Sequence, residues 1–210
     1  MVICSIRIVC QRSQDFDYFC IFITPLSSRL LTEFVQILAP LTDNPNAPSK
    51  YRYTPIHAAA CTGYSEIVQI LAPLTDNPNA PNNNGWTPIH MAACNGHTEI
   101  VKILAPLTDN PNAPNNNGKT PIYEAAWNGH TEIVKILAPL TDNSNVLNKY
   151  GKTPIHEAAL NGHIEIIKIL APLTDNPNAP DKDGKTPSSF VKNVEIKRFL
   201  ESFKADEPST

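Results

Sequence analysis

A unit of 33 residues occurs four times in this chain of 210 residues with almost no change. Each copy contains the tripeptide Thr-Pro-Ile, which begins at Thr54, Thr87, Thr120 and Thr153. The run Leu-Ala-Pro-Leu-Thr-Asp-Asn follows in every copy, beginning at Leu71, Leu104, Leu137 and Leu170, and it also begins at Leu38. A fixed period of roughly 20–50 residues is typical of an array of small stacked units. Such an array exposes long surfaces and seldom encloses a catalytic pocket.

The first half of one unit predicts a turn followed by a short helix. Residues 82–85 read Asn-Asn-Asn-Gly, and Asn and Gly adopt positive φ at little cost. Thr87 precedes a proline, as expected when a hydroxyl caps a helix and proline occupies its first turn. The helix is predicted over 88–94 and ends at Gly96, the usual left-handed residue after a helix.

The second half of the unit predicts another helix and an extended connector. This helix starts near 97–99, carries an apolar stripe, and should end by about Leu107 because Pro106 cannot donate a backbone hydrogen bond. The connector follows at 108–114. Both helices are shorter than the ~12–15 residues that an isolated helix needs, so each must be buried against a neighbouring unit. The fold class is therefore an all-α repeat solenoid of helix-turn-helix units.

The same unit resembles the ankyrin repeat. The matching residues, in order, are Gly85, Thr87-Pro88-Ile89-His90, Ala92-Ala93, Gly96-His97 and Glu99-Ile100-Val101. The resemblance covers residues 31 to 202, and its period of 33 residues is that of ankyrin repeats. It implies an ankyrin array with β-hairpin-like loops, four full repeats and partial units at both ends.

The expected organisation places repeat boundaries in the connectors. The segments are an irregular lead-in 1–23, a partial N-terminal repeat 24–48, ankyrin repeats 49–81, 82–114, 115–147 and 148–180, a truncated C-terminal capping repeat 181–204, and a tail 205–210. The capping helix is expected over 194–203, with charged residues facing water. The lead-in matches no repeat, and it can be a poorly packed segment, an improvised cap or a targeting segment.

Two features of single residues qualify the resemblance. Arg52 occupies the place of the turn glycine in repeat 49–81, so the tight turn there is in doubt. The glycine that ends the second helix in the family is replaced around Pro106, and the proline is expected to end the helix instead.

Composition limits the classes of partner. The formal net charge is −3, and both signs are scattered through every unit, so the sequence shows no basic stripe for nucleic acid. Arg7, Asp15 and Asp17 interrupt any membrane span in the lead-in. Five cysteines without CxxC spacing favour a reducing compartment, the cytoplasm or nucleus. We expect a monomer that binds a protein or peptide, without a cofactor or a small-molecule substrate.

The histidines suggest no catalysis. All six fall at two repeat positions, and tyrosine replaces them at Tyr64 and Tyr123, although a phenol cannot serve as an imidazole base. We expect one set to hydrogen-bond between neighbouring loops and the other to pack at the start of the second helix. The pairs His57/Cys61 and His90/Cys94 could in principle hold zinc, but the repeat itself dictates their spacing, so no metal site is predicted.

Differences between units indicate the binding surface. Units 82–114 and 115–147 differ mainly in the hairpin tip, the first helix and the connector, and the second helix is unchanged. In ankyrin repeats the tips and first helices line the concave surface that binds partners. The predicted partner-binding residues are Tyr51, Tyr53, Trp86, Met91, Lys119, Glu124, Trp127, Tyr150, Lys152 and Glu157. Exposed aromatic residues are typical of interface hot spots, although they could instead pack against adjacent tips.

Two alternatives to a binding module remain open. The resemblance implies that connector asparagines could be substrates of an asparaginyl hydroxylase, and the matching residues are Asn79, Asn112, Asn145 and Asn178. The usual Val or Ile before this asparagine is replaced by proline in three of the four units. The chain could also be a fragment of a larger ankyrin scaffold.

Overall fold

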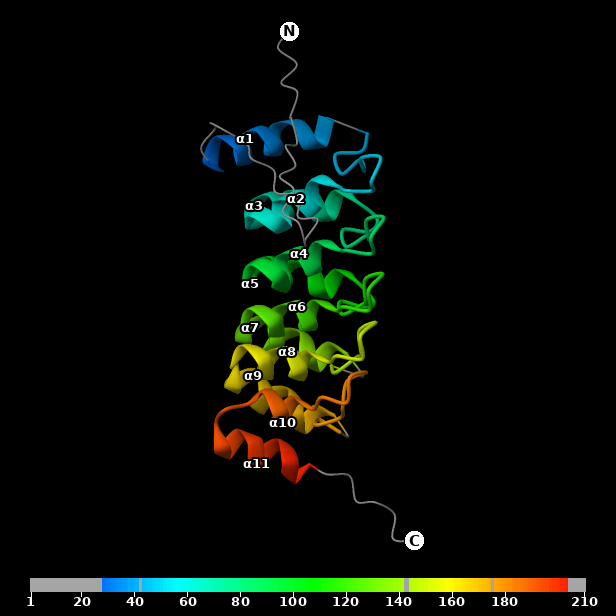
Figure 1. Ribbon diagram of the computed structural model, residues 1–210. Helices are drawn as coiled ribbons and strands as arrows, with labels where there is room; N and C mark the ends of the chain where they lie inside the picture. The colour runs from blue at the N-terminus through cyan, green and yellow to red at the C-terminus, as the bar shows by residue number, and fades with distance from the viewer. Residues whose placement is uncertain (1–27, 42, 142–143, 175, 204–210) are drawn as a thin grey trace.

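The protein is a stack of paired helices, seen in a computed structural model that describes residues 28–41, 43–141, 144–174 and 176–203. The inner helices of the pairs are α2 (Pro55–Thr62), α4 (Pro88–Asn95), α6 (Pro121–Asn128), α8 (Pro154–Asn161) and α10 (Pro187–Phe190). The outer helices are α1 (Ser28–Leu38), α3 (Ser65–Leu71), α5 (Thr98–Leu104), α7 (Thr131–Leu137), α9 (Ile164–Leu170) and α11 (Val194–Ser202). Each inner helix packs against the next inner helix, and the outer helices α1 to α9 do the same. The pairs run down the molecule as two columns, and the loops that join successive units gather on one side (Figure 1).

The inner helices begin and end where the sequence predicts. The hydroxyl of Thr87 accepts a hydrogen bond from the backbone N–H of His90, and the imidazole of His90 in turn accepts from the Thr87 N–H. Gly96 ends α4 with a left-handed φ of 79°. The predicted helix over 88–94 is confirmed, with one additional residue at its C-terminal end.

The outer helices end through proline, as expected. Each one from α1 to α9 continues into a short 3₁₀ helix with the sequence Ala-Pro-Leu: η1 (Ala39–Leu41), η2 (Ala72–Leu74), η3 (Ala105–Leu107), η4 (Ala138–Leu140) and η5 (Ala171–Leu173). Pro106 lies in the first turn of η3, and the helical segment ends at Leu107. Proline has no backbone N–H to donate. The first N–H groups of a 3₁₀ helix have no acceptor within that helix, so a proline at this position costs it no hydrogen bond.

The core lies between successive units. One isoleucine from each full inner helix is completely buried, and the alanines beside it allow the helices to approach closely; the isoleucines are Ile56, Ile89, Ile122 and Ile155. The outer helices bury a second row that includes Val68, Val101 and Val134. These buried side chains form one hydrophobic cluster that runs through all the units, so no unit has a core of its own.

Both sets of histidines join neighbouring units. The sequence predicts this for the first set, whereas for the second set it predicts only packing at the start of the second helix. His90 Nε2 donates to the carbonyl of Lys119 at 3.0 Å, and the equivalent bonds run from His57 to Trp86 and from His156 to Lys185. In the second set, His97 Nε2 donates to the carbonyl of Cys61 at 3.1 Å. A Cβ at Gly63 would lie 2.7 Å from the His97 ring, so only glycine leaves space for this contact.

A helix forms each end of the described stack. At the N-terminal end, α1 lies in the expected partial repeat 24–48, whereas the lead-in 1–23 and residues 24–27 are outside the described residues. At the other end, α11 covers the predicted capping helix except for Phe203, and Lys197 and Arg198 are exposed. The tail 205–210 is also outside the described residues.

Arg52 adopts the tight turn that the sequence placed in doubt. Its N–H donates to the Ser49 carbonyl at 2.8 Å, which is the bond that Gly85 makes to Asn82 in the next unit. Arg52 has φ of 60°, whereas the equivalent Gly85 has φ of 77°. The hydrogen bonds of the tip therefore hold a non-glycine residue in the left-handed region, where it is strained.

Replacing Arg52 by glycine is expected to stabilise the protein. Relief of the left-handed strain should raise the free energy of unfolding by about 1 kcal/mol, partly offset by the greater freedom of glycine in the unfolded chain. Urea unfolding of the Arg52→Gly variant would measure the change. The matched control is Gly85→Ala, which should be destabilising because its Cβ would lie 2.7 Å from Asn116 Oδ1. A lower stability for Arg52→Gly would contradict the assignment of strain.

Candidate partner-binding surface

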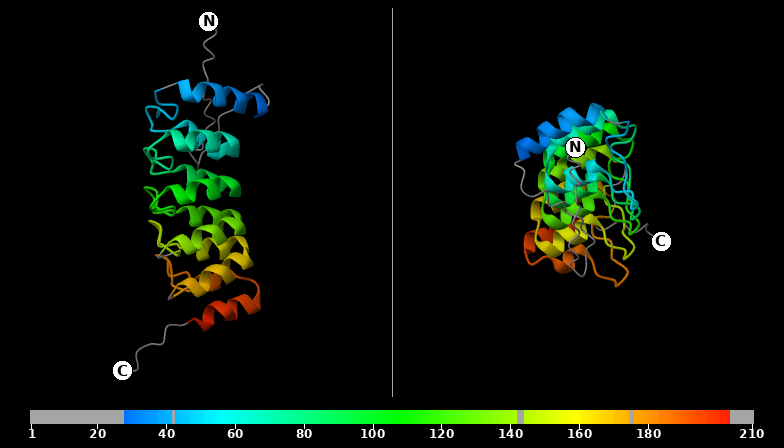
Figure 2. Two further views of the ribbon diagram at one scale, coloured as in Figure 1. Left: turned by 180° about the vertical axis from the view of Figure 1, so that it is seen from behind. Right: turned by 90° about the horizontal axis from the view of Figure 1, so that it is seen from above.

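The hairpin tips form one continuous edge, which we call the tip edge and define as residues 49–53, 82–86, 115–119, 148–152 and 181–185. Within a tip, Asn82 Oδ1 accepts hydrogen bonds from the N–H groups of Asn84 and Trp86 and fixes the turn. Between tips, the Asn116 N–H donates to the Asn84 carbonyl at 3.1 Å, and the same bond recurs along the stack. The edge is thus a rigid platform, seen on one side of the stack from the front, from behind and from above (Figures 1 and 2).

Two of the predicted partner-binding residues are exposed near the two ends of this edge, in its first and fourth tips. Tyr51 is 49% exposed and Tyr150 is 57% exposed. Lysine ammonium groups lie over both rings, Lys50 at 4.7 Å from the Tyr51 centroid and Lys149 at 5.0 Å from that of Tyr150. Each end of the edge therefore presents an amphipathic ring beside a positive charge.

Three further aromatic residues are only partly exposed. Tyr53 and Trp86 contact the histidine of their own helix, with ring centroids 5.1 Å and 5.5 Å apart. Trp127 contacts Tyr123 at 6.4 Å. Contact with a partner and packing within the molecule, the two interpretations of these aromatic residues, therefore both apply in part. Each ring contacts another ring of the molecule, while part of the side chain remains at the surface.

Three predicted partner-binding residues are buried. Met91 and Glu157 are 1% exposed and Glu124 is 2% exposed. All three occupy the same position of an inner helix, which is covered within the stack rather than exposed to solvent. Their side chains cannot contact a partner in this conformation, so they do not contribute to an accessible binding surface.

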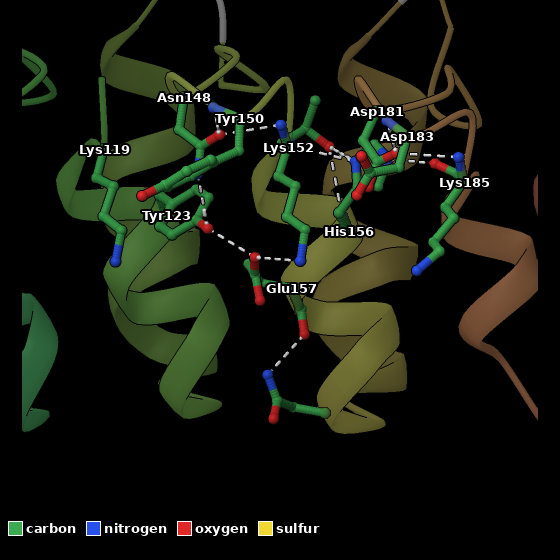
Figure 3. A network of polar contacts seen from close by, with 12 residues as sticks. Lys119, Tyr123, Asn148, Tyr150, Lys152, His156, Glu157, Asp181, Asp183 and Lys185 are labelled. Atoms are coloured by element: carbon green, nitrogen blue, oxygen red, sulfur yellow. Dashed lines mark hydrogen bonds and ion pairs between the residues drawn. The ribbon is translucent and has the colours of Figure 1, made fainter. Parts of the chain in front are cut away.

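Glu157 receives a hydrogen bond across the interface between units. Tyr123 Oη donates to Glu157 Oε1 at 2.6 Å, and Asn148 Nδ2 donates to Tyr123 Oη at 2.9 Å. Lys152 Nζ lies 3.7 Å from the same carboxylate (Figure 3). Burial and the bond to Glu157 raise the pKa of Tyr123, so the phenol stays protonated and can donate.

Lys119 compensates the charge of the other buried glutamate. Its Nζ lies 3.6 Å from Glu124 Oε1, an atom that makes no hydrogen bond among the described residues. The same ammonium lies 5.2 Å from the Tyr123 ring and 4.8 Å from the Trp127 ring. Burial raises the pKa of Glu124, and Lys119 opposes that shift. The side chain of Lys119 is only 14% exposed, so its main contacts are with Glu124, Tyr123 and Trp127 and it offers little surface to a partner.

The structure adds a surface residue that the sequence reasoning missed. Leu160 is 49% exposed on α8. It occupies the repeat position of Trp127 and Cys94, so a comparison of all four units, rather than of two, would have identified it.

The connector asparagines have a structural role. Asn79 Oδ1 accepts from the Ile89 N–H at 3.0 Å, and Asn112, Asn145 and Asn178 make the same bond to the start of the next inner helix. Asn46 makes it as well, in the partial N-terminal repeat. The first three of the predicted modification sites are buried, so a modifying enzyme would need the connector to open. Modification remains a prediction.

The histidines proposed as possible zinc ligands use both ring nitrogens. His57 Nδ1 accepts from the Thr54 N–H and its Nε2 donates to Trp86; His90 makes the equivalent pair of bonds. Among the described residues, no group of three or more His, Cys, Asp or Glu side chains is arranged to hold a metal ion. Within the same residues no helix has the length and hydropathy required to cross a bilayer.

The fold and the tip edge together define a helical repeat solenoid whose exposed surface varies from unit to unit. Comparison with family models identifies the repeat: a model of ankyrin repeats in three copies matches residues 73–146, and a model of the single ankyrin repeat matches 51–83 and 150–182. The chain belongs to the ankyrin repeat family. Ankyrin repeats are generally protein–protein interaction modules and are typically non-catalytic. No curated protein matched the sequence.

Proposed function

We propose that this protein is a non-enzymatic adaptor that binds a protein or peptide partner along the tip edge and the adjoining exposed faces of α4, α6 and α8. The observation that supports the proposal is the row of partly or fully exposed apolar side chains on this surface. Its members are Tyr51, Tyr53, Trp86, Trp127, Tyr150 and Leu160. Large amphipathic rings held by a rigid scaffold are favourable contact residues, since little entropy is lost when a partner binds.

The pattern of variation between units supports the same surface. The outer helices α5 and α7 have identical sequences, whereas the tips and inner helices differ at Trp86/Lys119 and Cys94/Trp127. The odd number of cysteines favours the cytoplasm or nucleus as the place where this partner is met.

A binding experiment with matched variants tests the proposal. The full chain, immobilised, is used to capture proteins from cell lysate, beside a variant with Tyr51→Ala, Trp86→Ala and Tyr150→Ala. We expect the captured partner to be lost or weakened by at least roughly tenfold, because truncating a hot-spot aromatic residue commonly costs ~2 kcal/mol or more. The partner is then identified by mass spectrometry and its affinity measured with the purified protein.

The control removes apolar surface from another part of the molecule. Leu107 and Leu140, on η3 and η4, are exposed to a similar extent, and Leu107→Ala with Leu140→Ala should leave capture unchanged. Circular dichroism and urea unfolding establish that both variants are folded. Loss of the partner from the leucine variant, with retention by the aromatic variant, would place the interface on the outer side and refute the proposal.

A further inference from the structure

The charges of this chain are scattered along the sequence but separated in space. The tip edge carries seven basic residues, which are Lys50, Arg52, Lys119, Lys149, Lys152, Lys182 and Lys185. The tips and inner helices together carry four carboxylates, and three of them, Glu124, Glu157 and Asp181, are buried. Exposed glutamates lie instead on the outer helices, where Glu99 and Glu132 form ion pairs with lysines of their own helix. The tip edge is therefore positively charged although the net charge of the chain is −3.

Four of these seven basic residues lie in the last two tips of the edge. Lys149 Nζ donates to Asn117 Oδ1 at 2.7 Å, and Lys182 Nζ donates to the carbonyl of Lys149 at 2.6 Å. Both acceptors are neutral, so neither bond cancels the charge of the ammonium. The Lys185 side chain extends away from Asp181 and Asp183 (Figure 3).

Two of the three carboxylates near this cluster, Asp181 and Glu157, are already engaged. Asp181 Oδ1 accepts from the backbone N–H groups of Asp183 and Lys185, both at 2.9 Å. Glu157 is paired with Lys152 and Tyr123. Asp183 is the one exposed carboxylate of the described tips. Lys149, Lys182 and Lys185 are thus three exposed lysines beside one exposed carboxylate, and the Lys149 ammonium lies over the Tyr150 ring.

We propose that Lys149, Lys182 and Lys185 bind an acidic segment of a protein partner, with the Tyr150 ring contacting an apolar residue between its carboxylates. The inference rests on the proposed function, because it names the chemistry of the partner that the tip edge accepts. Complementary charge of this kind sets the register of a complex and speeds association.

The spacing of the tips indicates the form of the acidic segment. Successive inner helices are in contact, so neighbouring tips are about 8–10 Å apart, the usual distance between packed helices. A polyproline II segment has three residues per turn and rises about 3.1 Å per residue, so side chains three positions apart share one face and can reach the lysines of the neighbouring tips 148–152 and 181–185. The partner segment is therefore in the polyproline II conformation, with acidic residues three positions apart.

A protein segment fits this surface better than a nucleic acid. The two central tips present Asn83, Asn84, Asn116 and Asn117, which are exposed and uncharged. A single strand of nucleic acid carries a phosphate at every nucleotide, and proteins that bind it line the whole path with positive charge. Here the positive charge is interrupted in the middle of the edge.

Fluorescence anisotropy with designed peptides tests the proposal on the full chain. The probe is a labelled peptide of repeated Glu-Ser-Leu triplets, and the comparison is the same peptide with Gln in place of Glu. We expect the Glu peptide to bind more tightly and to weaken as salt is added. The variant Lys149→Ala, Lys182→Ala, Lys185→Ala should lose roughly tenfold in affinity, since it removes three exposed charges that each contribute modestly to binding.

The matched control removes the same total charge from the outer helices. Lys102→Ala, Lys135→Ala and Lys168→Ala should leave the affinity near that of the parent, because these lysines lie on α5, α7 and α9. Equal binding of the Glu and Gln peptides, no binding of either, or equal loss in both lysine variants would overturn the proposal. Tighter binding of a labelled single-stranded oligonucleotide than of the Glu peptide would also overturn it, in favour of nucleic acid.

The two proposals fail separately. If the Glu peptide does not bind while the lysate partner still depends on Tyr51, Trp86 and Tyr150, only the acidic character of the partner is wrong. If the lysate partner does not depend on those aromatic residues, the binding surface itself is wrong.

Discussion

Acidification below pH 6.5 is expected to destabilise the stack steeply, because His57 and His90 are buried in the neutral form. Burial lowers the pKa of each to about 4 from 6.5, against a weaker opposing effect of the hydrogen bond to the next tip. The unfolded chain binds these protons near pH 6.5, whereas the folded stack binds them only near pH 4. The stability that the neutral rings contribute is complete above pH 6.5 and is lost as the pH falls towards 4. The loss should reach about 3 kcal/mol for each ring. Urea unfolding at a series of pH values measures it.

The control separates the histidines from the other titrating groups. The pKa of His156 is also lowered by burial and acts in the same direction, whereas Glu124, with a raised pKa, stabilises the folded state as it gains a proton. A His57→Gln, His90→Gln variant should therefore show a shallower dependence on pH than the parent. Titration of the parent's imidazole protons by NMR gives a direct check. Values near 6.5 for His57 and His90 in the folded protein would contradict the prediction.

Replacing Lys119 by alanine is expected to cost about 3 kcal/mol of unfolding free energy. The change leaves the buried carboxylate of Glu124 without the ammonium that lies 3.6 Å away, and an uncompensated buried charge is costly. The Lys119 ammonium also lies over the rings of Tyr123 and Trp127, so cation–π contacts are lost with the charge. Urea unfolding of Lys119→Ala at neutral pH provides the measurement.

Another unit of the repeat indicates a second substitution that should restore the stability of this variant. Unit 82–114 has Trp86 and Met91 at the positions of Lys119 and Glu124. The double variant Lys119→Trp, Glu124→Met should therefore recover most of the lost stability, because it removes both members of the buried pair. Lys149→Ala, which removes an exposed lysine, should have little effect on stability. If it costs as much as Lys119→Ala, burial of the Lys119–Glu124 pair is not what stabilises this interface.

The helices could be predicted from the sequence because each boundary depends on local chemistry. The Thr87 cap, the left-handed Gly96 and Pro106 all act within a few residues of the helix ends that they determine. The family models at 51–83, 73–146 and 150–182 bear out the repeat itself. The doubt about the tight turn at Arg52 was wrong, because hydrogen bonds within the tip and to the next tip outweigh the preference of arginine for negative φ.

The buried part of the candidate site could not be predicted. An inner helix such as α6 contacts a helix on each side, so an apolar stripe no longer separates buried from exposed positions. Glu124 and Glu157 therefore look like surface residues in the sequence although their partners cover them. The bond from Tyr123 to Glu157 spans 34 residues, and only the stacking of units brings the two side chains together.

The Tyr123–Glu157 hydrogen bond limits how this array can change length. If unit 82–114 were deleted, Tyr123, Glu157 and Asn148 would keep their mutual positions, because the junction between the third and fourth units is untouched. If unit 115–147 were deleted instead, His90 would take the place of Tyr123, and Glu157 would lose its phenol donor. Losing a bond to a buried charged group costs more than losing a neutral one. Units that precede this junction can thus be gained or lost more readily than units that form it. One tyrosine and one glutamate therefore distinguish the third and fourth units in an array whose members are otherwise nearly interchangeable.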